Sequence, residues 1–255
     1  MTTPEGLPTL TVSGHCATIR LNRPSVHNRI EPDDIVEIMR LCDVVDGDRD
    51  VRVLVLAAGG KSFSSGFYIQ QIGTREGSTT AGFDVMTDRM ERVRVPSIAA
   101  LNGGVYGGST DLALSCDFRI GVAGMSMFMP AAKLGLHYYP GGMQRYVSRL
   151  GLDTAKRLFL TGERLGAEEL LRIGFLTELV APEGLEAAVE ARVAQLVANA
   201  PLAVQGMKKA LNDIARGDAD LAEIAERAAA VGKSKDLLEG RAAFEQKRAP
   251  HFTGE

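Results

Sequence analysis

The sequence predicts an α/β fold, because apolar runs typical of strands alternate with segments of helical periodicity. Residues 51–58 form a nearly continuous apolar run, as in a strand covered on both faces of a sheet. From Pro32 to Val45, apolar residues recur at helical spacing. Residues 96–101 predict a further strand, which runs into glycines with a helix directly behind them. Such alternation places the loops that carry chemistry at one edge of a sheet.

The other elements are predicted from the same patterns. Residues 9–12 and 16–21 are short apolar runs separated by Ser13-Gly14-His15, as in a β-hairpin. Residues 80–94 predict a helix, and residues 118–123 predict a strand. After residue 180 the periodicity is helical, and it predicts helices over residues 184–199, 201–215, 218–231 and 235–248.

Length and composition restrict the possible functions. The 255 residues, 45% of them hydrophobic, suit one large domain or a domain with an appendage. The net charge of −3 provides no broad basic field for nucleic acid. Cys16, Cys42 and Cys116 lack metal-ligand spacing, which predicts buried reduced thiols and no metal site. The N-terminal residues show no basic start followed by an apolar run, and the sequence has no apolar stretch of about 18 residues. We therefore expect a cytoplasmic protein with no membrane partner.

The stretch from Ala99 to Leu114 carries the clearest functional signal. A strand runs into Gly107 and Gly108, where a helix begins with Asp111 in its first turn. Unpaired N–H groups at a helix start favour negative charge, and glycines let a ligand approach the main chain. The turn therefore predicts an anion site beside an acid that carries a proton. The alternative is a tight strand-to-helix connection in which the acid only stabilises the helix dipole.

Several short motifs occur in order along almost the whole chain. They are Asn22-Arg23-Pro24 with Asn28, Lys61-Ser62-Phe63-Ser64-Ser65-Gly66, Asn102-Gly103 with Gly107-Gly108 and Asp111-Leu112-Ala113, Lys133-Leu134-Gly135-Leu136 with Gly141-Gly142-Met143-Gln144-Arg145, Leu160-Thr161-Gly162, and the closing segment Gly240 to Phe252. Each motif is loose alone, but this many in order are specific. Together they resemble the crotonase superfamily, the enoyl-CoA hydratase/isomerase group.

The resemblance implies a crotonase-type spiral of ββα units that binds acyl-CoA over residues 1–195. A C-terminal helical region over residues 196–255 would serve trimer assembly, giving a homotrimer or a dimer of trimers. The substrate would be an acyl-CoA thioester, so coenzyme A enters with the substrate and no separate cofactor is expected. By matching motif positions, the backbone N–H groups of Phe67 and Gly108 would form an oxyanion hole that stabilises a thioester enolate.

The acid and base groups depart from the pattern of this family. Typical hydratases have one glutamate at the position of Asp111 and a second just after the proline of the next loop. Here the first is a shorter aspartate, and Ala131 follows Pro130. Because the two carboxylates together activate a water, the loss of the second one and the shorter reach of the first disfavour ordinary hydration.

His137-Tyr138-Tyr139 stands where relatives have a small apolar or proline-rich turn. The methylmalonyl-CoA decarboxylases of this family, to which the chain is partly similar, carry a tyrosine at a position like that of Tyr138. Decarboxylation needs an electron sink and a later proton, but no general base. The alternative interpretation of the three rings is packing.

The leading hypothesis is a lyase or isomerase of the enoyl-CoA hydratase/isomerase family that acts through an enolate, with Asp111 as proton carrier. Its alternatives are a decarboxylase or C–C lyase that uses Tyr138, with Tyr139 beside it, and a non-catalytic acyl-CoA-binding scaffold.

Candidate contacts to the substrate come from several loops. The resemblance implies that the backbone from Ser64 to Phe67, which includes Ser65 and Gly66, holds the adenine, while basic side chains hold the phosphates. The other substrate-binding candidates are Tyr68, Ala131, His137, Arg29, Lys61 and Lys247. Loops such as 69–85 set the length, branching and aromaticity of the acyl group, which the sequence leaves open.

Overall fold

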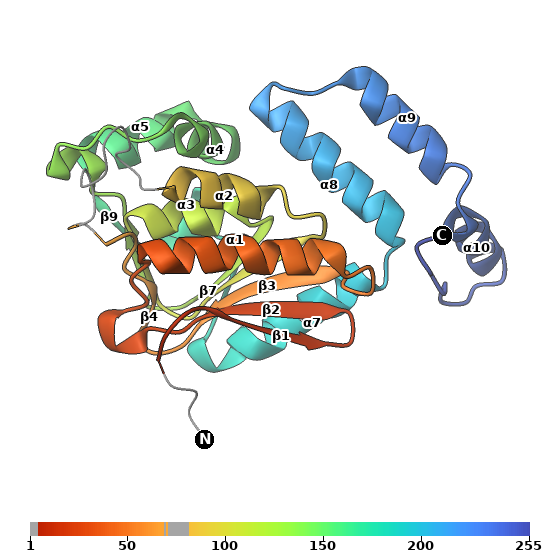
Figure 1. Ribbon diagram of the computed structural model, residues 1–255, viewed down its shortest axis with the longest axis horizontal. Helices are drawn as coiled ribbons and strands as arrows, with labels where there is room; N and C mark the ends of the chain where they lie inside the picture. Colours follow the sequence, from red (N-terminus) through yellow and green to blue (C-terminus); the bar gives the residue numbers. More distant parts are fainter. Residues whose placement is uncertain (1–4, 69, 71–81) are drawn as a thin grey trace.

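The computed structural model describes residues 5–68, 70 and 82–255, and a six-stranded sheet lies at the centre of this part of the chain (Figure 1). The strand order is β1-β2-β3-β5-β7-β10, and all neighbours are parallel except the hairpin of β1 and β2. The strands are β1 Thr9–Ser13, β2 Cys16–Leu21, β3 Val53–Ala58, β5 Ser97–Leu101, β7 Phe118–Val122 and β10 Glu178–Val180.

A second, smaller sheet continues from the ends of these strands. Within the described residues it has the order β4-β6-β8-β9, with β9 antiparallel to β8. Its strands are β4 Ser62–Ser64, β6 Gly104–Tyr106, β8 Ser126–Phe128 and β9 Arg164–Gly166. Because β4 follows β3, β6 follows β5 and β8 follows β7, each turn of the chain adds one strand to each sheet. A helix or a loop then completes the turn, which is the predicted repeat of two strands and a helix.

The large sheet is covered on both faces, as the apolar run of β3 predicts. One face packs against α1, α2 and α3 in the main hydrophobic core, and the other packs against α7. The helices of the core are α1 Pro32–Gly47, α2 Phe83–Glu91, α3 Gly108–Ser115, α4 Pro140–Leu150, α5 Leu152–Thr161, α6 Ala167–Arg172 and α7 Leu185–Val197. Short 3-10 helices lie at Pro24–Val26, Ala131–Leu134 and Pro182–Gly184.

The last three helices extend away from the sheet (Figure 1). They are α8 Pro201–Arg216, α9 Leu221–Val231 and α10 Lys235–Glu245. Helix α8 contacts α4 and α9, whereas α10 lies at the far end of the molecule. The predicted division between residues 195 and 196 therefore falls within α7, which packs on the sheet, and it stays a prediction.

The α/β class, the hairpin and the C-terminal helices are confirmed. The sequence patterns do not predict the four short strands of the smaller sheet, strand β10 or the helices α4, α5 and α6, and the predicted elements differ from the observed ones at their ends. Strand β3 begins at Val53 because a turn, with the Val51 N–H donating to Asp48, occupies the preceding residues. Helix α9 begins at Leu221 because the Asp220 carboxylate caps it. Helix α10 ends before Lys247, whose backbone is left-handed. Residues 80 and 81 of the predicted helix 80–94, and most of loop 69–85, lie outside the described residues.

All three thiols are free, as the composition predicts. Burial raises the pKa of Cys42 and of Cys116 to about 12. Cys16 is half-buried, and burial raises the pKa of its thiol as well.

We expect Cys42 and Cys116 of the native protein to resist thiol reagents at pH 8. A thiol with a pKa of about 12 is ~10⁻⁴ ionised there, against about a quarter for a free cysteine. Counting modified thiols by mass spectrometry should show that Cys16 reacts first, and that all three react in denaturant. Fast native modification of Cys116 would contradict the burial of that side chain.

Candidate functional site

The glycine turn joins β6 to α3 through a backbone conformation that suits only glycine. Gly107 has φ 56° and ψ −132°, and its N–H donates to the Phe128 carbonyl at 3.0 Å. Gly108 is the first residue of α3, so its N–H has no carbonyl partner inside the helix. The turn therefore presents a free donor at the positive end of a helix dipole.

The segment after β4 lies directly against this turn. A Cβ atom on Gly66 would meet the Tyr106 carbonyl oxygen at 2.5 Å and the Gly108 nitrogen at 3.0 Å, and Gly66 has φ +89°. Ser109 Oγ joins the two segments by donating to the Ser64 carbonyl at 2.9 Å. Only a glycine at position 66 lets these two segments of the chain approach each other this closely.

The next residue, Phe67, has a backbone N–H that faces away from its neighbouring strand segment. The Gly66 carbonyl and the Tyr68 N–H both pair with Ile30, which forms a parallel bridge to Phe67. In such a bridge the N–H of the central residue points to the other side. Within the described part of the chain, neither the Phe67 N–H nor the Gly108 N–H donates a hydrogen bond to a backbone carbonyl.

An apolar pocket of about 140 Å³ opens beside the turn. Its lining contains Gly108, Ala131, His137 and both predicted tyrosines, so several sequence-predicted residues meet here. The complete set of described lining residues is Ser65, Phe67, Phe83, Tyr106, Gly107, Gly108, Phe128, Met129, Pro130, Ala131, Leu134, Leu136, His137, Tyr138 and Tyr139. None of these residues is an aspartate or a glutamate.

Tyr138 and Tyr139 are stacked and buried in the pocket wall. Their ring centroids are 4.2 Å apart, and the Tyr138 hydroxyl donates to the Tyr139 hydroxyl at 3.0 Å. A Cβ atom on Gly142 would clash with both rings, so the second glycine of Gly141-Gly142 makes room for the pair. Burial raises the pKa of each phenol well above its ordinary value, and the nearby Asp111 carboxylate adds to the rise. Both tyrosines therefore keep their protons at neutral pH.

The Asp111 carboxylate lies behind the tyrosine pair and is fully buried. Its Oδ2 atom accepts from the Tyr139 hydroxyl at 2.6 Å and from Arg145 Nη2 at 2.7 Å, while Oδ1 accepts from Arg145 Nε at 2.9 Å. Such a bidentate pair is the strongest arrangement available to a carboxylate. The structure thus places Asp111 outside the pocket lining, where it reaches the pocket only through Tyr139.

Arg145 is itself surrounded by further acceptors on α2. Its Nη1 atom donates to Asp88 at 2.7 Å and lies 3.4 Å from Glu91, and Nη2 donates to Thr87 at 2.8 Å. Burial opposes the charged guanidinium, but the hydrogen bonds and charges of Asp111, Glu91 and Asp88 raise the pKa of Arg145 above its ordinary value. Arg145 therefore stays charged and joins α2, α3 and α4.

The remaining candidates lie on β4, close to it in the chain or on the segment that pairs with the residues after it, and of these only Ser65 lines the pocket. Ser64 is buried and shapes the loop, because its Oγ donates to the Asn28 carbonyl and accepts from the Gly66 N–H. Ser65 and Lys61 are exposed. Arg29 stacks on Tyr68, with 3.8 Å between its guanidinium carbon and the ring centroid, and pairs with Glu31 at 2.5 Å.

Two candidates have a different setting. His137 is exposed at the pocket rim, and its Nδ1 lies 2.8 Å from the Tyr138 carbonyl oxygen. Lys247 is exposed after α10, which lies at the opposite end of the molecule from α4 (Figure 1). One copy of the chain therefore does not bring Lys247 to the pocket.

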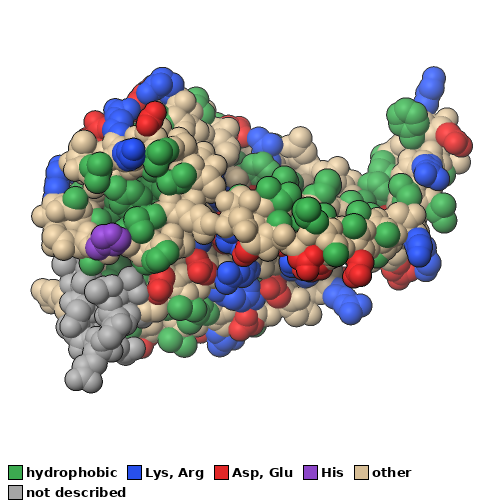
Figure 2. Space-filling view, turned by 90° about the horizontal axis from the view of Figure 1, so that it is seen from above, with side chains coloured by type: hydrophobic (Ala, Val, Ile, Leu, Met, Phe, Trp, Pro, Cys, Tyr) green, Lys and Arg blue, Asp and Glu red, His purple; other side chains and the backbone are tan. Residues whose placement is uncertain are grey.

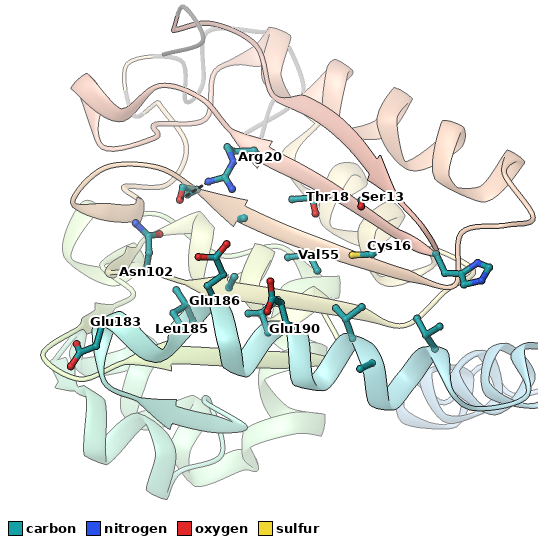
Figure 3. A pocket seen from close by; sticks show the side chains of 18 of the residues that line it. Ser13, Cys16, Thr18, Arg20, Val55, Asn102, Glu183, Leu185, Glu186 and Glu190 are labelled. Atoms are coloured by element: carbon teal, nitrogen blue, oxygen red, sulfur yellow. Dashed lines mark hydrogen bonds between the residues drawn. The ribbon is translucent and has the colours of Figure 1, made fainter. Parts of the chain in front are cut away.

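A larger groove of about 820 Å³ lies on the other face of the six-stranded sheet, between β2 and α7 (Figure 3). Glu183, Glu186 and Glu190 lie along its helical side, with Arg20 on the strand opposite. None of the predicted site residues lines this groove, and it has no glycine turn. The smaller pocket is therefore the candidate site.

Several residues that support the pocket from behind Asp111 are not identified by the sequence motifs. They are Arg145 and its partners Thr87, Asp88 and Glu91. The i, i+3 spacing of Asp88 and Glu91 places both acids on one face of α2, which is the available signal. It does not identify the arginine that faces them.

Across the described residues no group of three or more His, Cys, Asp and Glu side chains has a metal-binding arrangement. No helix in the same part of the chain is long and apolar enough to cross a membrane.

Comparisons with known proteins agree with this architecture. The family model described as enoyl-CoA hydratase/isomerase matches residues 11–255. A short-chain-enoyl-CoA hydratase of Clostridium acetobutylicum is 32% identical over 245 residues, which cover 92% of this chain and 93% of the relative. A crotonyl-CoA hydratase of Syntrophomonas wolfei is 32% identical over 244 residues, which cover 92% of this chain and 94% of that relative. A solved enoyl-CoA hydratase structure from Bacillus anthracis has a TM-score of 0.88 at 28% identity, covering 98% of this chain and 100% of that one.

We expect Gly66→Ala to destabilise the protein more than Gly124→Ala. Gly124 also has positive φ, +81°, but its Cβ would meet nothing within 4 Å, so this control isolates the backbone cost of about 1–2 kcal/mol. At Gly66 the clash with the Tyr106 carbonyl adds to that cost. Urea unfolding followed by circular dichroism gives both free energies. Equal losses would show that the two chain segments do not approach each other closely.

Proposed function

Because this chain belongs to the enoyl-CoA hydratase/isomerase family, we propose that it converts an acyl-CoA thioester through an enolate. The N–H groups of Phe67 and Gly108 hold the thioester oxygen and stabilise its negative charge. Two observations support this role. Both N–H groups lack a backbone acceptor in the described chain, and the close approach of Gly66 to Gly108 brings them to the same end of the pocket.

We further propose that the enolate forms by loss of a carboxyl group rather than by attack of water. The observation that carries this proposal is the Arg145–Asp111 ion pair, which occupies the Asp111 carboxylate on the far side of the tyrosines. The described pocket lining holds no aspartate or glutamate, and Ala131 lines it. A reaction that needs no general base fits such a pocket, whereas water activation by a carboxylate pair does not.

In this reaction the bond between the α-carbon and the carboxyl carbon of a malonyl-type thioester breaks, and CO₂ leaves. The electron pair of that bond enters the enolate, whose oxygen accepts from the Phe67 and Gly108 N–H groups. The Tyr138 hydroxyl, which donates to the Tyr139 hydroxyl in the structure, turns toward the substrate and gives its proton to the α-carbon, and solvent returns a proton to the phenolate. Burial raises the pKa of Tyr138, so its hydroxyl holds the proton at neutral pH until the enolate forms.

Hydration or double-bond isomerisation is the second candidate, and the names of the two relatives above favour it. In that case Asp111 would act through the hydrogen-bonded chain from Tyr138 to Tyr139. A scaffold that binds acyl-CoA without converting it is the third candidate.

We propose that Arg29, Lys61 and Lys247 contact the phosphates of coenzyme A. Arg29 has a buried Nε atom without a hydrogen-bond partner, and it lies beside Tyr68, which suits an anionic ligand. Lys61 is exposed just before β4, and Ser65 is exposed just after it. Lys247 is far from this pocket, so we propose that it serves the site of a neighbouring copy.

Assembly into a trimer, alone or paired, is supported by an apolar surface on the C-terminal helices. Figure 2 shows hydrophobic side chains gathered along this region. Met207, Leu211 and Ile214 form a stripe along α8 and are 56–65% exposed, and Phe244 on α10 is 87% exposed. Surfaces of this kind in soluble proteins mark interfaces.

Incubation in heavy water with a malonyl-type and an α,β-unsaturated CoA thioester separates the three candidates. We expect the first to lose CO₂ and gain one deuterium at the α-carbon by mass spectrometry. Tyr138→Phe should slow this by about 10²–10⁴-fold, the usual contribution of a general acid. Tyr146→Phe is the matched control, because it removes a buried hydroxyl that bonds Thr110 and does not line the pocket.

Other results of this assay have defined meanings. A gain of water by the unsaturated thioester would replace decarboxylation with hydration. Binding without change of either thioester would support the scaffold. An unaltered rate in Tyr138→Phe would remove Tyr138 from the proton transfer.

We expect Leu211→Glu to dissociate the assembly, because it places a charge in the middle of the α8 stripe. Val36→Glu is the control, since Val36 is similarly exposed at 63% but lies on α1. Analytical ultracentrifugation at matched concentrations measures the change. A monomeric wild-type protein would contradict the proposed trimer.

A further inference from the structure

Three pairs of aromatic rings line the pocket. The pairs are Phe67 with Phe83 at 5.9 Å, Tyr106 with Phe128 at 5.3 Å, and Tyr138 with Tyr139 at 4.2 Å between ring centroids. The chain has 9 phenylalanines, 5 tyrosines and no tryptophan, so a large share of its rings meets in this one cavity. They come from separate segments, namely the loop after β4, α2, β6, β8 and the turn before α4.

The size of the cavity matches one six-membered ring. Its volume is about 140 Å³, and an apolar protein cavity of ~150 Å³ is known to take up benzene. The pocket therefore suits a compact apolar group.

The position of the cavity places that group close to the reacting carbon. The Phe83 ring lies against the glycine turn, because a Cβ atom on Gly108 would be 3.0 Å from two of its ring atoms. A thioester oxygen held at the Gly108 N–H therefore leaves its acyl substituent among the rings.

The rings are held in fixed orientations, which favours an aromatic occupant. Phe67 and Phe83 meet at 64°, an edge-to-face arrangement. The Arg164 guanidinium carbon lies 4.6 Å from the Phe128 centroid and 5.1 Å from that of Tyr106, and it holds this pair from β9. Fixed ring faces and edges attract the edges and faces of another aromatic ring, an electrostatic contribution that a saturated ring of similar size does not gain.

We propose that the acyl group of the substrate carries an aryl ring near the thioester, as in an arylacetyl or arylmalonyl thioester. This inference rests on the proposed function, because it takes the pocket as the acyl site. It adds the chemical class of the acyl group, which the family alone leaves open.

The test compares phenylacetyl-CoA with cyclohexylacetyl-CoA, two saturated-chain thioesters that differ only in the aromaticity of the ring. Isothermal titration calorimetry on the full-length protein gives both dissociation constants without requiring turnover. We expect phenylacetyl-CoA to bind ~3- to 10-fold more tightly, in line with the contribution of one aromatic pair. Butyryl-CoA should bind more weakly than either.

Phe128→Leu should reduce the preference for phenylacetyl-CoA by ~2- to 10-fold, because it removes one ring of the wall. Phe118→Leu is the matched control. Phe118 packs with the core on the opposite face of the large sheet, so its loss should leave the preference unchanged. Circular dichroism confirms that both variants are folded.

Equal binding of the two ring thioesters, or tighter binding of butyryl-CoA, would overturn the inference while leaving the proposed function intact. An equal loss of preference in both variants would also overturn it. If no CoA thioester binds, the proposed function fails together with the inference.

Discussion

The buried ion pair between Arg145 and Asp111 is the interaction on which the pocket depends. It joins α3, which carries Asp111, to α4, and the contacts of Arg145 with Asp88 and Glu91 extend it to α2. Removing two charges from water is costly, and here the bidentate geometry and the extra acceptors offset that cost. Loss of one partner would leave an uncompensated buried charge, which typically destabilises a protein by about 3–5 kcal/mol.

The same ion pair sets the chemistry of the pocket. The Asp111 carboxylate accepts from Arg145 and Tyr139 and does not line the pocket. The pocket is lined at this place by the neutral phenol rings of Tyr138 and Tyr139. In the proposed mechanism the donors to the substrate are the backbone N–H groups of Phe67 and Gly108, which do not depend on the side chain at position 67. A pocket lined by neutral phenols and aromatic rings, with no carboxylate in its described lining, favours stabilisation of charge on a substrate over removal of a proton.

Close approach of two backbone segments completes this arrangement. Gly66 lies against Tyr106 and Gly108, and Gly142 makes room for the stacked tyrosines. In both places a methyl group would occupy space that another residue already fills. Glycine is therefore required at these positions because a side chain would push the two segments apart. Ser109 strengthens the contact at Gly66 through its hydrogen bond to the Ser64 carbonyl.

The sequence by itself determined the α/β class, the glycine turn, the C-terminal helices and the absence of a second acid at Ala131, because periodicity and short motifs depend on residues close in the chain. It also indicated Tyr138 and Tyr139 as unusual. Only the tertiary structure decided that Arg145 occupies Asp111 and that rings from five segments surround one cavity. These contacts join residues tens of positions apart, whose distances follow from how helices and sheets pack and not from local spacing.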